Sequence, residues 1–315
     1  MRFLIKESEA RKKEVKLNVK DRKLIQLLVQ DSRMGVSELA KKLQISKSAI
    51  TQKIRALQEK EVLMAPVTYA SVKVEEKPFY FVQIATGLGQ DTELISQDLL
   101  SIKGVSAILW YNGSYNLLLG VFHEDIHQAI QEIGNYLTIK KVRITRVTDN
   151  WFHSPHLFEE VADKGTTFLR TNPKIISSDR KILNTLFENP RATLLEIAEK
   201  TRSAPITIKK RMEEMKKSGA IIQFSNYVNP WLCGKDIVSV HFSVLGRENI
   251  DKVIKKLLSL PQTGNVWELD HEWNLNVVFW VDNQIEVGKI LEDLSKNYTG
   301  ILDMDVMVMV KMVGR

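Results

Sequence analysis

The stretch from Asp21 to Leu57, DRKLIQLLVQDSRMGVSELAKKLQISKSAITQKIRAL, decides how this chain folds. Apolar residues recur at helical spacing after Asp21, again within 36–43, and a third time after Ser46. An acidic residue suits a helix N-terminus, and Ser46 can cap a third helix that buries Ile50 and Leu57. Three short helices with a tight turn between the second and third predict a helix-turn-helix.

The third helix carries a polar face opposite its apolar one. In a helix-turn-helix, the N-terminal end of this helix enters the major groove of DNA. Side chains of this mixed type can contact both base edges and phosphates, and Lys53 is expected to reach the DNA backbone. The predicted DNA-contacting residues here are Ser46, Lys47, Ser48, Thr51, Gln52, Lys53 and Arg55.

The chain repeats itself at an offset of 158 residues, in register and without gaps across most of its length. Nine residues are identical within 43 aligned positions of the helix-turn-helix region. The same offset places FYFVQIA from Phe79 over IVSVHFS from Ile237. We therefore expect two full units, about 21–150 and 179–312, joined by a Pro- and Gly-containing linker.

The second copy supplies a second candidate DNA-reading helix. Pro205 occupies a first-turn position, where its missing N–H costs nothing, although Glu213 and Glu214 weaken the positive charge of the helix. The first copy is therefore expected to dominate affinity. The predicted DNA-contacting residues of the second copy are Pro205, Thr207, Lys209, Lys210 and Arg211.

Downstream of each helix-turn-helix, the pattern reads strand, helix, strand, strand, helix, strand, which predicts a ferredoxin-like (βαββαβ) sandwich. In the first unit the expected pieces are 79–86, 92–101, 105–111, 115–122, 125–137 and 142–148. One face of such a sheet needs a partner, for which the second unit's sheet is the natural candidate. The chain is thus predicted to be α+β, with tandem winged or helix-turn-helix and sandwich domains at 1–66, 67–152, 179–224 and 225–315, and a linker at 153–178.

Composition agrees with a folded protein that binds a polyanion. Hydrophobic residues make up 44% and charged residues 26% of the 315 residues, and the net charge is +7. Positive charge gathers in 1–23 and 41–60, which suits phosphate neutralisation. The single cysteine, Cys233, excludes an intrachain disulfide. With neither a signal-like start nor an apolar run of roughly 18 residues, we expect a cytoplasmic protein without membrane insertion.

The motifs D-R-K-x-x-x-x-L, E-L-A-K-K-L and S-K-S-A-I-T-Q-K-I-R-A-L, in this order, resemble those of the Lrp/AsnC (feast/famine) transcription regulators. The resemblance covers nearly the whole chain, in a fused tandem form, and implies double-stranded DNA as partner, homo-oligomers such as a dimer, and a small-molecule effector such as an amino acid. A Gly-x-x-Asp turn helps form that family's effector site, and Asn replaces the Asp here in both copies. The effector-binding positions it implies are Gly113, Tyr115, Asn116, Trp273 and Asn274.

An enzyme on the same fold is the main alternative. Tyr115-Asn116-Leu117 and Trp273-Asn274-Leu275 also resemble the siroheme decarboxylases, but the upstream stretch 106–111 lacks the His and Arg of that group. A third reading gives the helix-turn-helices a protein partner instead of DNA.

Two histidine motifs have metal-ligand spacing. His123-Glu-Asp-Ile-His127 fits H-E-x-x-H, yet it begins at a strand end and the second unit has Val281 and Ile285 at the two His positions. His153-Ser-Pro-His156 falls in the expected linker. We expect no catalytic residue, metal or cofactor.

Overall fold

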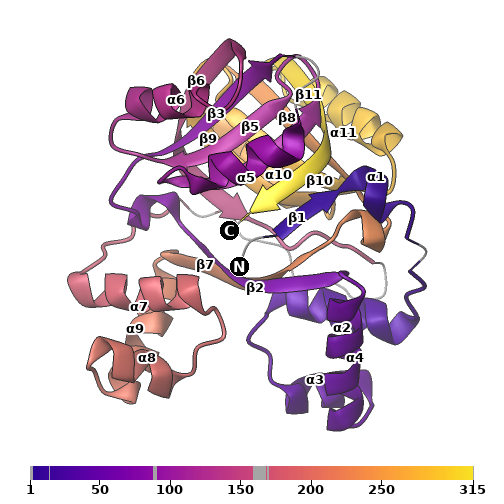
Figure 1. Cartoon of the computed structure of the whole chain (residues 1–315), viewed down its shortest axis with the longest axis vertical. Helices are drawn as coiled ribbons and strands as arrows, with labels where there is room; N and C mark the ends of the chain where they lie inside the picture. Colours follow the sequence, from indigo (N-terminus) through magenta and orange to yellow (C-terminus); the bar gives the residue numbers. More distant parts are fainter. Residues whose placement is uncertain (1–2, 14, 88–90, 159–167, 169, 315) are drawn as a thin grey trace.

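The computed structural model describes residues 3–13, 15–87, 91–158, 168 and 170–314 (Figure 1). The helices are α1 Glu7–Ala10, α2 Val19–Gln30, α3 Val36–Leu43, α4 Lys47–Glu59, α5 Thr92–Ser101, α6 Ile126–Gly134, α7 Ser177–Glu188, α8 Leu194–Thr201, α9 Pro205–Lys217, α10 Arg247–Leu258 and α11 Gln284–Asn297, with 3-10 turns η1 Val72–Val74 and η2 Trp231–Cys233. The strands are β1 Phe3–Lys6, β2 Leu63–Ala70, β3 Phe79–Thr86, β4 Val105–Asn112, β5 Leu117–Phe122, β6 Ile139–Phe152, β7 Ile221–Val228, β8 Asp236–Val244, β9 Thr263–Asp270, β10 Leu275–Val281 and β11 Ile301–Gly314. Within these described ranges, no helix is both long and apolar enough to cross a bilayer.

The two predicted sandwiches join into one closed barrel. Its strand order is β11-β4-β5-β3-β6-β9-β10-β8, and β8 pairs again with β11. Two strands of 14 residues each make the joins. The first half of β6 pairs with β3 and its second half with β9, while β11 pairs with β8 and then with β4. The α+β fold is confirmed, and each sheet's second face is covered by the other unit, as expected.

Alternation along the barrel strands separates two apolar layers. On β4, Ile108 and Trp110 pack with the helices of the first unit, whereas Leu109 and Tyr111 face the barrel interior. In Figure 1, α5 and α6 cover one side of the barrel and α11 lies on the other. The interior is therefore a layer shared by both units, while each helical layer comes mainly from one unit, with Val313 of β11 joining the first and Trp151 of β6 joining the second.

A two-stranded antiparallel ribbon of β2 and β7 lies between the barrel and the two helix-turn-helices (Figure 1). β2 follows α4 and β7 follows α9, so each unit's third helix leads directly into the ribbon. The ribbon spans the boundaries expected at 66/67 and 224/225, and α7 begins two residues before the expected start at 179.

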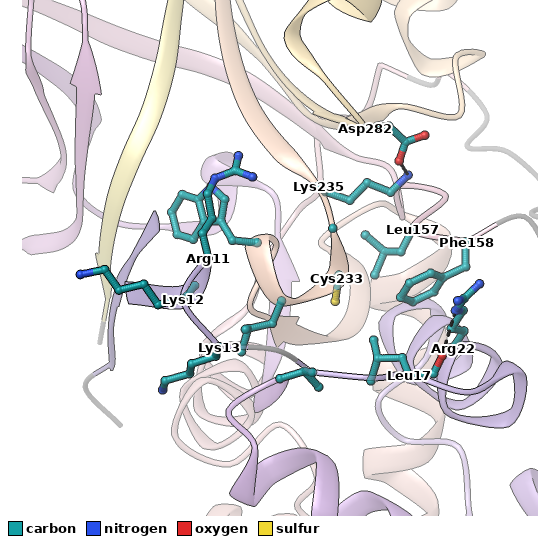
Figure 2. A pocket seen from close by; sticks show the side chains of 15 residues that line it. Arg11, Lys12, Lys13, Leu17, Arg22, Leu157, Phe158, Cys233, Lys235 and Asp282 are labelled. Carbon is teal, nitrogen blue, oxygen red and sulfur yellow. Dashed lines mark hydrogen bonds and ion pairs between the residues drawn. The ribbon is translucent and has the colours of Figure 1, made fainter. Parts of the chain in front are cut away.

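The N-terminal arm adds to the sheet, which the sequence pattern did not predict. β1 pairs antiparallel with the end of β11, and α1 follows it. Together with η2, the start of α2 and the segment at Leu157 and Phe158, the arm surrounds an open cleft of about 1060 Å³ (Figure 2). The arm therefore belongs structurally to the barrel and not to the helix-turn-helix that it precedes in sequence.

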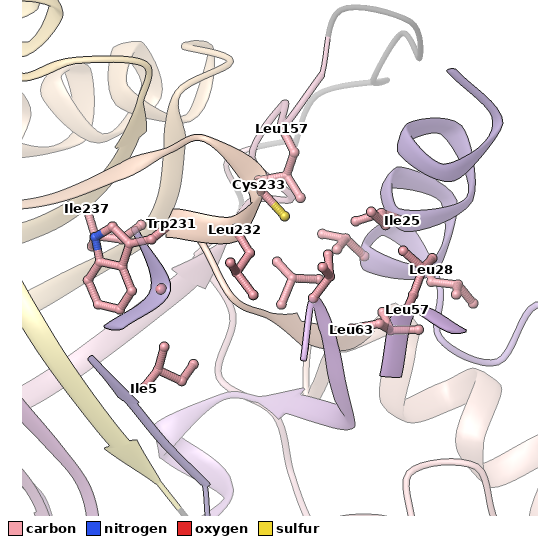
Figure 3. Packing of buried hydrophobic residues seen from close by; sticks show 14 of the residues in the cluster. Ile5, Ile25, Leu28, Leu57, Leu63, Leu157, Trp231, Leu232, Cys233 and Ile237 are labelled. Atoms are coloured by element: carbon pink, nitrogen blue, oxygen red, sulfur yellow. The ribbon is translucent and has the colours of Figure 1, made fainter. Parts of the chain in front are cut away.

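The two helix-turn-helices are attached to the barrel differently. The core of the first, including Ile25 and Leu57, runs through Leu157 and the η2 residues Trp231 and Leu232 into the barrel interior as one buried cluster (Figure 3). The second has a separate core of its own, to which η1 contributes only Val74. The start of the linker is hydrogen-bonded to the first helix-turn-helix. The Gln26 side chain donates to the Pro155 carbonyl (3.1 Å) and accepts from the Leu157 N–H (2.9 Å). Residues 159–167 and 169 of that linker lie outside the described range.

Candidate DNA-binding surface

Helix α4 has the polar face that its sequence predicts. Ser46 is the N-cap, and its hydroxyl accepts from the Ala49 N–H at 3.1 Å. Ile50 and Leu57 are buried on the opposite face. The cap residue and the predicted readers Lys47, Ser48, Thr51, Gln52 and Arg55 are all exposed. The helix therefore presents a continuous row of donors and acceptors to solvent.

Local bonds hold part of this row in place. The Thr51 hydroxyl donates to the Lys47 carbonyl at 3.1 Å, and the Ser46 and Ser48 hydroxyls lie 2.9 Å apart. The Arg55 guanidinium lies 2.9 Å from the carboxylate of Glu59, one helical turn later, but the Arg55 side chain keeps 81% of its surface exposed. Such an exposed ion pair is worth well under about 1 kcal/mol, so it leaves Arg55 available to a phosphate or a base.

Lys53 does not point into solvent with the exposed polar residues of α4. Its ammonium lies 2.6 Å from the Asp21 carboxylate of α2, and both side chains are largely covered. The pair fastens the DNA-reading helix to the first helix of the motif. The phosphate contact predicted for Lys53 would require this ion pair to open.

Helix α9 repeats the backbone of α4 with a different surface. Pro205 occupies the first turn, and Thr207, Lys209 and Lys210 are exposed as predicted. Ala204 offers no capping side chain where the first copy has Ser46. Ile206 is 73% exposed at the position that corresponds to Ser48. The second face is therefore more basic at its centre but poorer in hydrogen-bonding groups at its N-terminal end.

Arg211, predicted to contact DNA, instead repeats the arrangement of Lys53. It forms a two-pronged pair with Asp179, with its Nε 2.7 Å from one carboxylate oxygen, and it also contacts Glu214. Asp179 is completely buried. The hydrogen bond to Asp179 raises the pKa of Arg211. Asp21 and Asp179 are identical residues at the 158-residue offset, and this shared acidic partner is the signal that could have revealed both pairs.

Reciprocal arginines tie the two helix-turn-helices to each other. The Arg33 guanidinium donates to the carbonyls of Pro190 (2.6 Å) and Ala192 (2.7 Å), and its partial burial lowers its pKa. Arg191, the equivalent residue, donates to the Ser32 carbonyl at 2.7 Å. This contact, which we call the arginine clasp, fixes how the two reading helices stand relative to one another.

The predicted effector positions divide into structural and open groups. The Asn116 amide accepts from the Thr86 N–H (2.8 Å) and donates to the Thr86 hydroxyl (2.9 Å). The Asn274 amide bonds the N–H and carbonyl of Val244 in the same way. Both asparagines thus join the start of one strand to the end of its neighbour. Gly113 lies exposed in the turn before Asn116.

Tyr115 and Trp273, the equivalent residues of the two units, meet around a residue that the sequence did not indicate. The Arg143 guanidinium lies 4.7 Å from the Tyr115 ring and 5.7 Å from the Trp273 ring. Its Nη1 is buried and has no hydrogen-bond partner within the described structure. Burial and, secondarily, the charge of Arg143 lower the pKa of the nearby His241 to about 3. Arg143 is the group at these turns that an anionic effector could contact.

The open cleft beside the arm is rich in cations, but most of them are already paired. Arg11 contacts Glu7 and Asp236, Lys13 contacts Glu61, and Lys235 lies 2.7 Å from Asp282. The Arg22 guanidinium lies 5.9 Å from the ring of Phe158 (Figure 2). These pairs neutralise much of the positive charge around the cleft.

The histidine motifs have structural roles. The His123 ring accepts from the Asp125 N–H at 3.1 Å, where Asp125 caps α6. His153 is buried and lies 2.9 Å from the Thr263 carbonyl. Across the part of the chain that the structure describes, no group of three His, Cys, Asp or Glu side chains is arranged to hold a metal ion.

Comparisons with known proteins match both helix-turn-helices. The AsnC-type helix-turn-helix domain matches residues 17–58, and the winged helix-turn-helix DNA-binding model matches residues 177–222. The HTH-type transcriptional regulator FL11 of Pyrococcus furiosus is 26% identical over 133 residues, which are 42% of this chain and 87% of that protein. PH1055 of Pyrococcus horikoshii, named an uncharacterized HTH-type transcriptional regulator, is 28% identical over 134 residues, 41% of this chain and 82% of its own length.

A fold match covers both units at once. The crystal structure of the siroheme decarboxylase NirDL superimposes with a TM-score of 0.56 at 14% identity, over 93% of this chain and 91% of that one. At this identity the match shows the shared fold and nothing about chemistry. Each single-unit relative spans less than half of the chain, which is consistent with the internal repeat. The chain therefore carries an AsnC-type helix-turn-helix domain, and it is similar to HTH-type transcriptional regulators in a form that carries two units.

Proposed function

We propose that this protein is a sequence-specific DNA-binding transcription regulator, which reads duplex DNA mainly through α4 and less strongly through α9. The observation that carries the proposal is the exposed face of α4, where Lys47, Thr51, Gln52 and Arg55 stand in one row on a helix whose other face is buried. Glutamine pairs well with adenine and arginine with guanine in the major groove. Both reading helices lie on the side of the ribbon away from the barrel (Figure 1).

The two ion pairs define which residues read DNA and which hold the readers. Lys53 and Arg211 face Asp21 and Asp179, so we assign them to positioning the helices. The direct contacts are then left to the exposed residues of α4, with Thr207, Lys209 and Lys210 on α9. The arginine clasp makes the pair of helices one unit with a set spacing, the intrachain equivalent of a dimer.

The finer parts of this function are proposals as well. A small-molecule effector, an amino acid or a similar compound, would bind near the turns at 113–116 and 271–274, where Arg143 could receive its carboxylate. Further homo-oligomerisation through the barrels and a cytoplasmic location fit a regulator of this family. We assign no catalytic residue.

A siroheme decarboxylase activity is the second candidate function, because NirDL shares the fold across both units. A tetrapyrrole with many carboxylates needs several basic partners. The apolar cavity of about 610 Å³ below the barrel offers none: Glu75 is the sole acidic or basic side chain among the described residues that line it. The residues that line this cavity therefore fit this substrate poorly, and in the open cleft beside the arm the cations Arg11, Lys13 and Lys235 are already paired with carboxylates.

One experiment separates the two candidates. The purified protein is titrated with its own upstream DNA and with random competitor across a salt series, and the same sample is scanned for tetrapyrrole absorbance after incubation with siroheme. We expect specific binding that weakens steeply with salt, without a stoichiometric tetrapyrrole spectrum. Tetrapyrrole binding in the absence of DNA binding would overturn the proposal.

A further inference from the structure

A cavity of about 610 Å³ lies between the barrel interior and the β2/β7 ribbon. We call it the ribbon cavity. Its walls come from both halves of the barrel, through β3, β4, β5, β9, β10 and β11, and from β2 and β7 of the ribbon. This volume falls within the range of pockets that hold small ligands.

The interior of the barrel is incompletely filled toward the ribbon. Leu109, Trp267, Val278 and Trp280 face the interior with the buried cluster, yet each keeps part of its surface accessible. Protein interiors are normally packed without such space. Aromatic rings form much of the wall: Phe81 and Trp267 lie with ring centroids 5.3 Å apart. The exposed faces of these rings offer stacking area to a ligand.

Charge on the walls restricts what could bind there. Glu75 is half-buried, and its desolvation raises the pKa of its carboxyl group, which favours the neutral form. No described wall residue carries a positive charge. A charged ligand would lose its hydration without gaining a counter-ion, which is costly. Amide side chains line the cavity instead, from Asn226, Asn265 and Asn276, although the Asn276 amide nitrogen already donates to the Ser239 hydroxyl at 2.7 Å.

The cavity is separate from the turns where the effector positions were predicted. Those turns, 113–116 and 271–274, join β4 to β5 and β9 to β10. The cavity is lined by Val105 and Phe122, at the opposite ends of β4 and β5, and by Asn265 and Trp280 of β9 and β10. None of the turn residues, all of which the structure describes, lines the cavity, although its lining extends from the ribbon end along the barrel interior to Tyr111 and Leu118.

The ribbon connects this cavity to both reading helices. Tyr69 of β2 and Tyr227 of β7, equivalent residues of the two units, line the cavity and are hydrogen-bonded to each other. Tyr69 also stacks on Phe152 of β6, with ring centroids 3.8 Å apart. Because α4 and α9 lead directly into β2 and β7, a shift of this tyrosine pair changes how the reading helices are held.

We propose that the ribbon cavity binds an uncharged small molecule with a mainly apolar ring system and a few hydrogen-bonding groups. Occupancy changes DNA affinity through the β2/β7 ribbon, and this second part rests on the proposed function. The ligand differs in charge and in place from the amino acid that the family resemblance implies.

The test uses the neutral fluorescent probe N-phenyl-1-naphthylamine, with anionic 1-anilinonaphthalene-8-sulfonate as the charge control. We expect the neutral probe to bind the whole protein at least tenfold more tightly than the anionic one. Val278→Trp and, independently, Met312→Trp fill the cavity and should each weaken neutral-probe binding at least tenfold. The control Val306→Trp adds the same side chain at a position that is 43% exposed and should leave binding unchanged.

Circular dichroism of each variant identifies any that fails to fold. If one filling variant is unfolded, the other tests whether the probe binds in the cavity. Equal probe binding by the wild type and a folded filling variant would overturn the proposed site. A saturating probe should shift affinity for upstream DNA at least threefold in the wild type and not in a filling variant. Probe binding without that shift overturns the coupling alone, whereas absence of any DNA binding overturns the proposed function and leaves the site standing.

Discussion

The two helix-turn-helices have the same backbone and different surfaces. Their helices match residue for residue at the 158-residue offset, and Gln44 and Arg202 occupy the equivalent turn with the same left-handed φ of 54°. The exposed positions diverge: Arg55 of α4 corresponds to Glu213 of α9. Buried positions are therefore enough to specify the motif twice, while the outward positions are free to make one copy a stronger DNA reader than the other.

The same two regions differ in how they join the rest of the protein. The first shares a continuous apolar core with the barrel through Trp231 and Leu157, and the second has its own core. Local opening follows such boundaries between packed units. We therefore expect the stronger reader to be held rigidly against the barrel and the second to move more easily.

The largest effect should come from removing the join itself. Trp231→Ala deletes a nearly buried ring from the shared core and should lower the free energy of unfolding by about 3–5 kcal/mol, measured in urea. Truncation of the exposed Tyr136 to Ala is the matched control and should cost below about 0.5 kcal/mol. A loss below about 1 kcal/mol for Trp231→Ala would mean that the first helix-turn-helix is no better anchored than the second.

The equivalent aspartates sharpen the comparison inside each motif. Asp179→Ala leaves the Arg211 guanidinium without its main partner and removes the acceptor for the Ile176 N–H, so it should destabilise the second motif by about 2 kcal/mol. Asp21→Ala likewise removes the acceptor for the Asn18 N–H, but it breaks only a one-pronged pair with the more flexible Lys53 at a less buried site, and should cost about 1 kcal/mol. Hydrogen exchange of the α7 and α2 amides measures each change locally. Equal losses of stability in the two variants would show that the burial of Asp179 does not strengthen its ion pair.

A pH experiment distinguishes the barrel halves that carry the two motifs. Burial lowers the pKa of His241 to about 3, while its equivalent in the first unit, Gln83, does not titrate in this range. The neutral imidazole is the native form, so its stabilisation is full above the unfolded pKa of about 6.5 and is lost as pH falls from there toward 3. Between pH 7 and pH 5 the wild type should lose about 2 kcal/mol more than His241→Gln. Parallel curves for the two proteins would contradict this burial.

The arginine clasp gives the smallest expected effect. Arg33→Ala removes two bonds to carbonyls and a guanidinium that lies 5.0 Å from the Phe224 ring, and should cost about 1–2 kcal/mol in unfolding free energy. Arg191→Ala removes the single bond to Ser32 and should cost about 1 kcal/mol. If neither variant alters stability or DNA affinity, the two motifs are not coupled through this contact.

Apolar periodicity predicted the local elements closely. The helix at 36–43, the strand at 79–86 and the helix at 92–101 have the bounds that their patterns indicate. These elements bury one regular face, so the sequence carries the signal directly. The 158-residue offset then predicts the same helices and strands in the second unit.

Long-range pairings could not be predicted in the same way. The closing of the barrel by β6 and β11, the β2/β7 ribbon and the addition of β1 join segments that are far apart in sequence, and no local period marks their partners. At the candidate site, Lys53 and Arg211 lie at the edge of the polar face, where a helical pattern cannot tell an outward side chain from one that is turned toward Asp21 or Asp179. Arg143 was missed because its neighbours come from both units.

The measurement that tests this account most directly is the affinity of two charge variants for the protein's own upstream DNA. Arg55→Glu should weaken specific binding about 100-fold and reduce its salt dependence, because a cation at the reading face is replaced by an anion. Glu213→Arg, the mirror change in the second motif, should tighten binding a few-fold. Unchanged affinity of Arg55→Glu in a folded protein would contradict the claim that the first helix-turn-helix is the principal DNA reader.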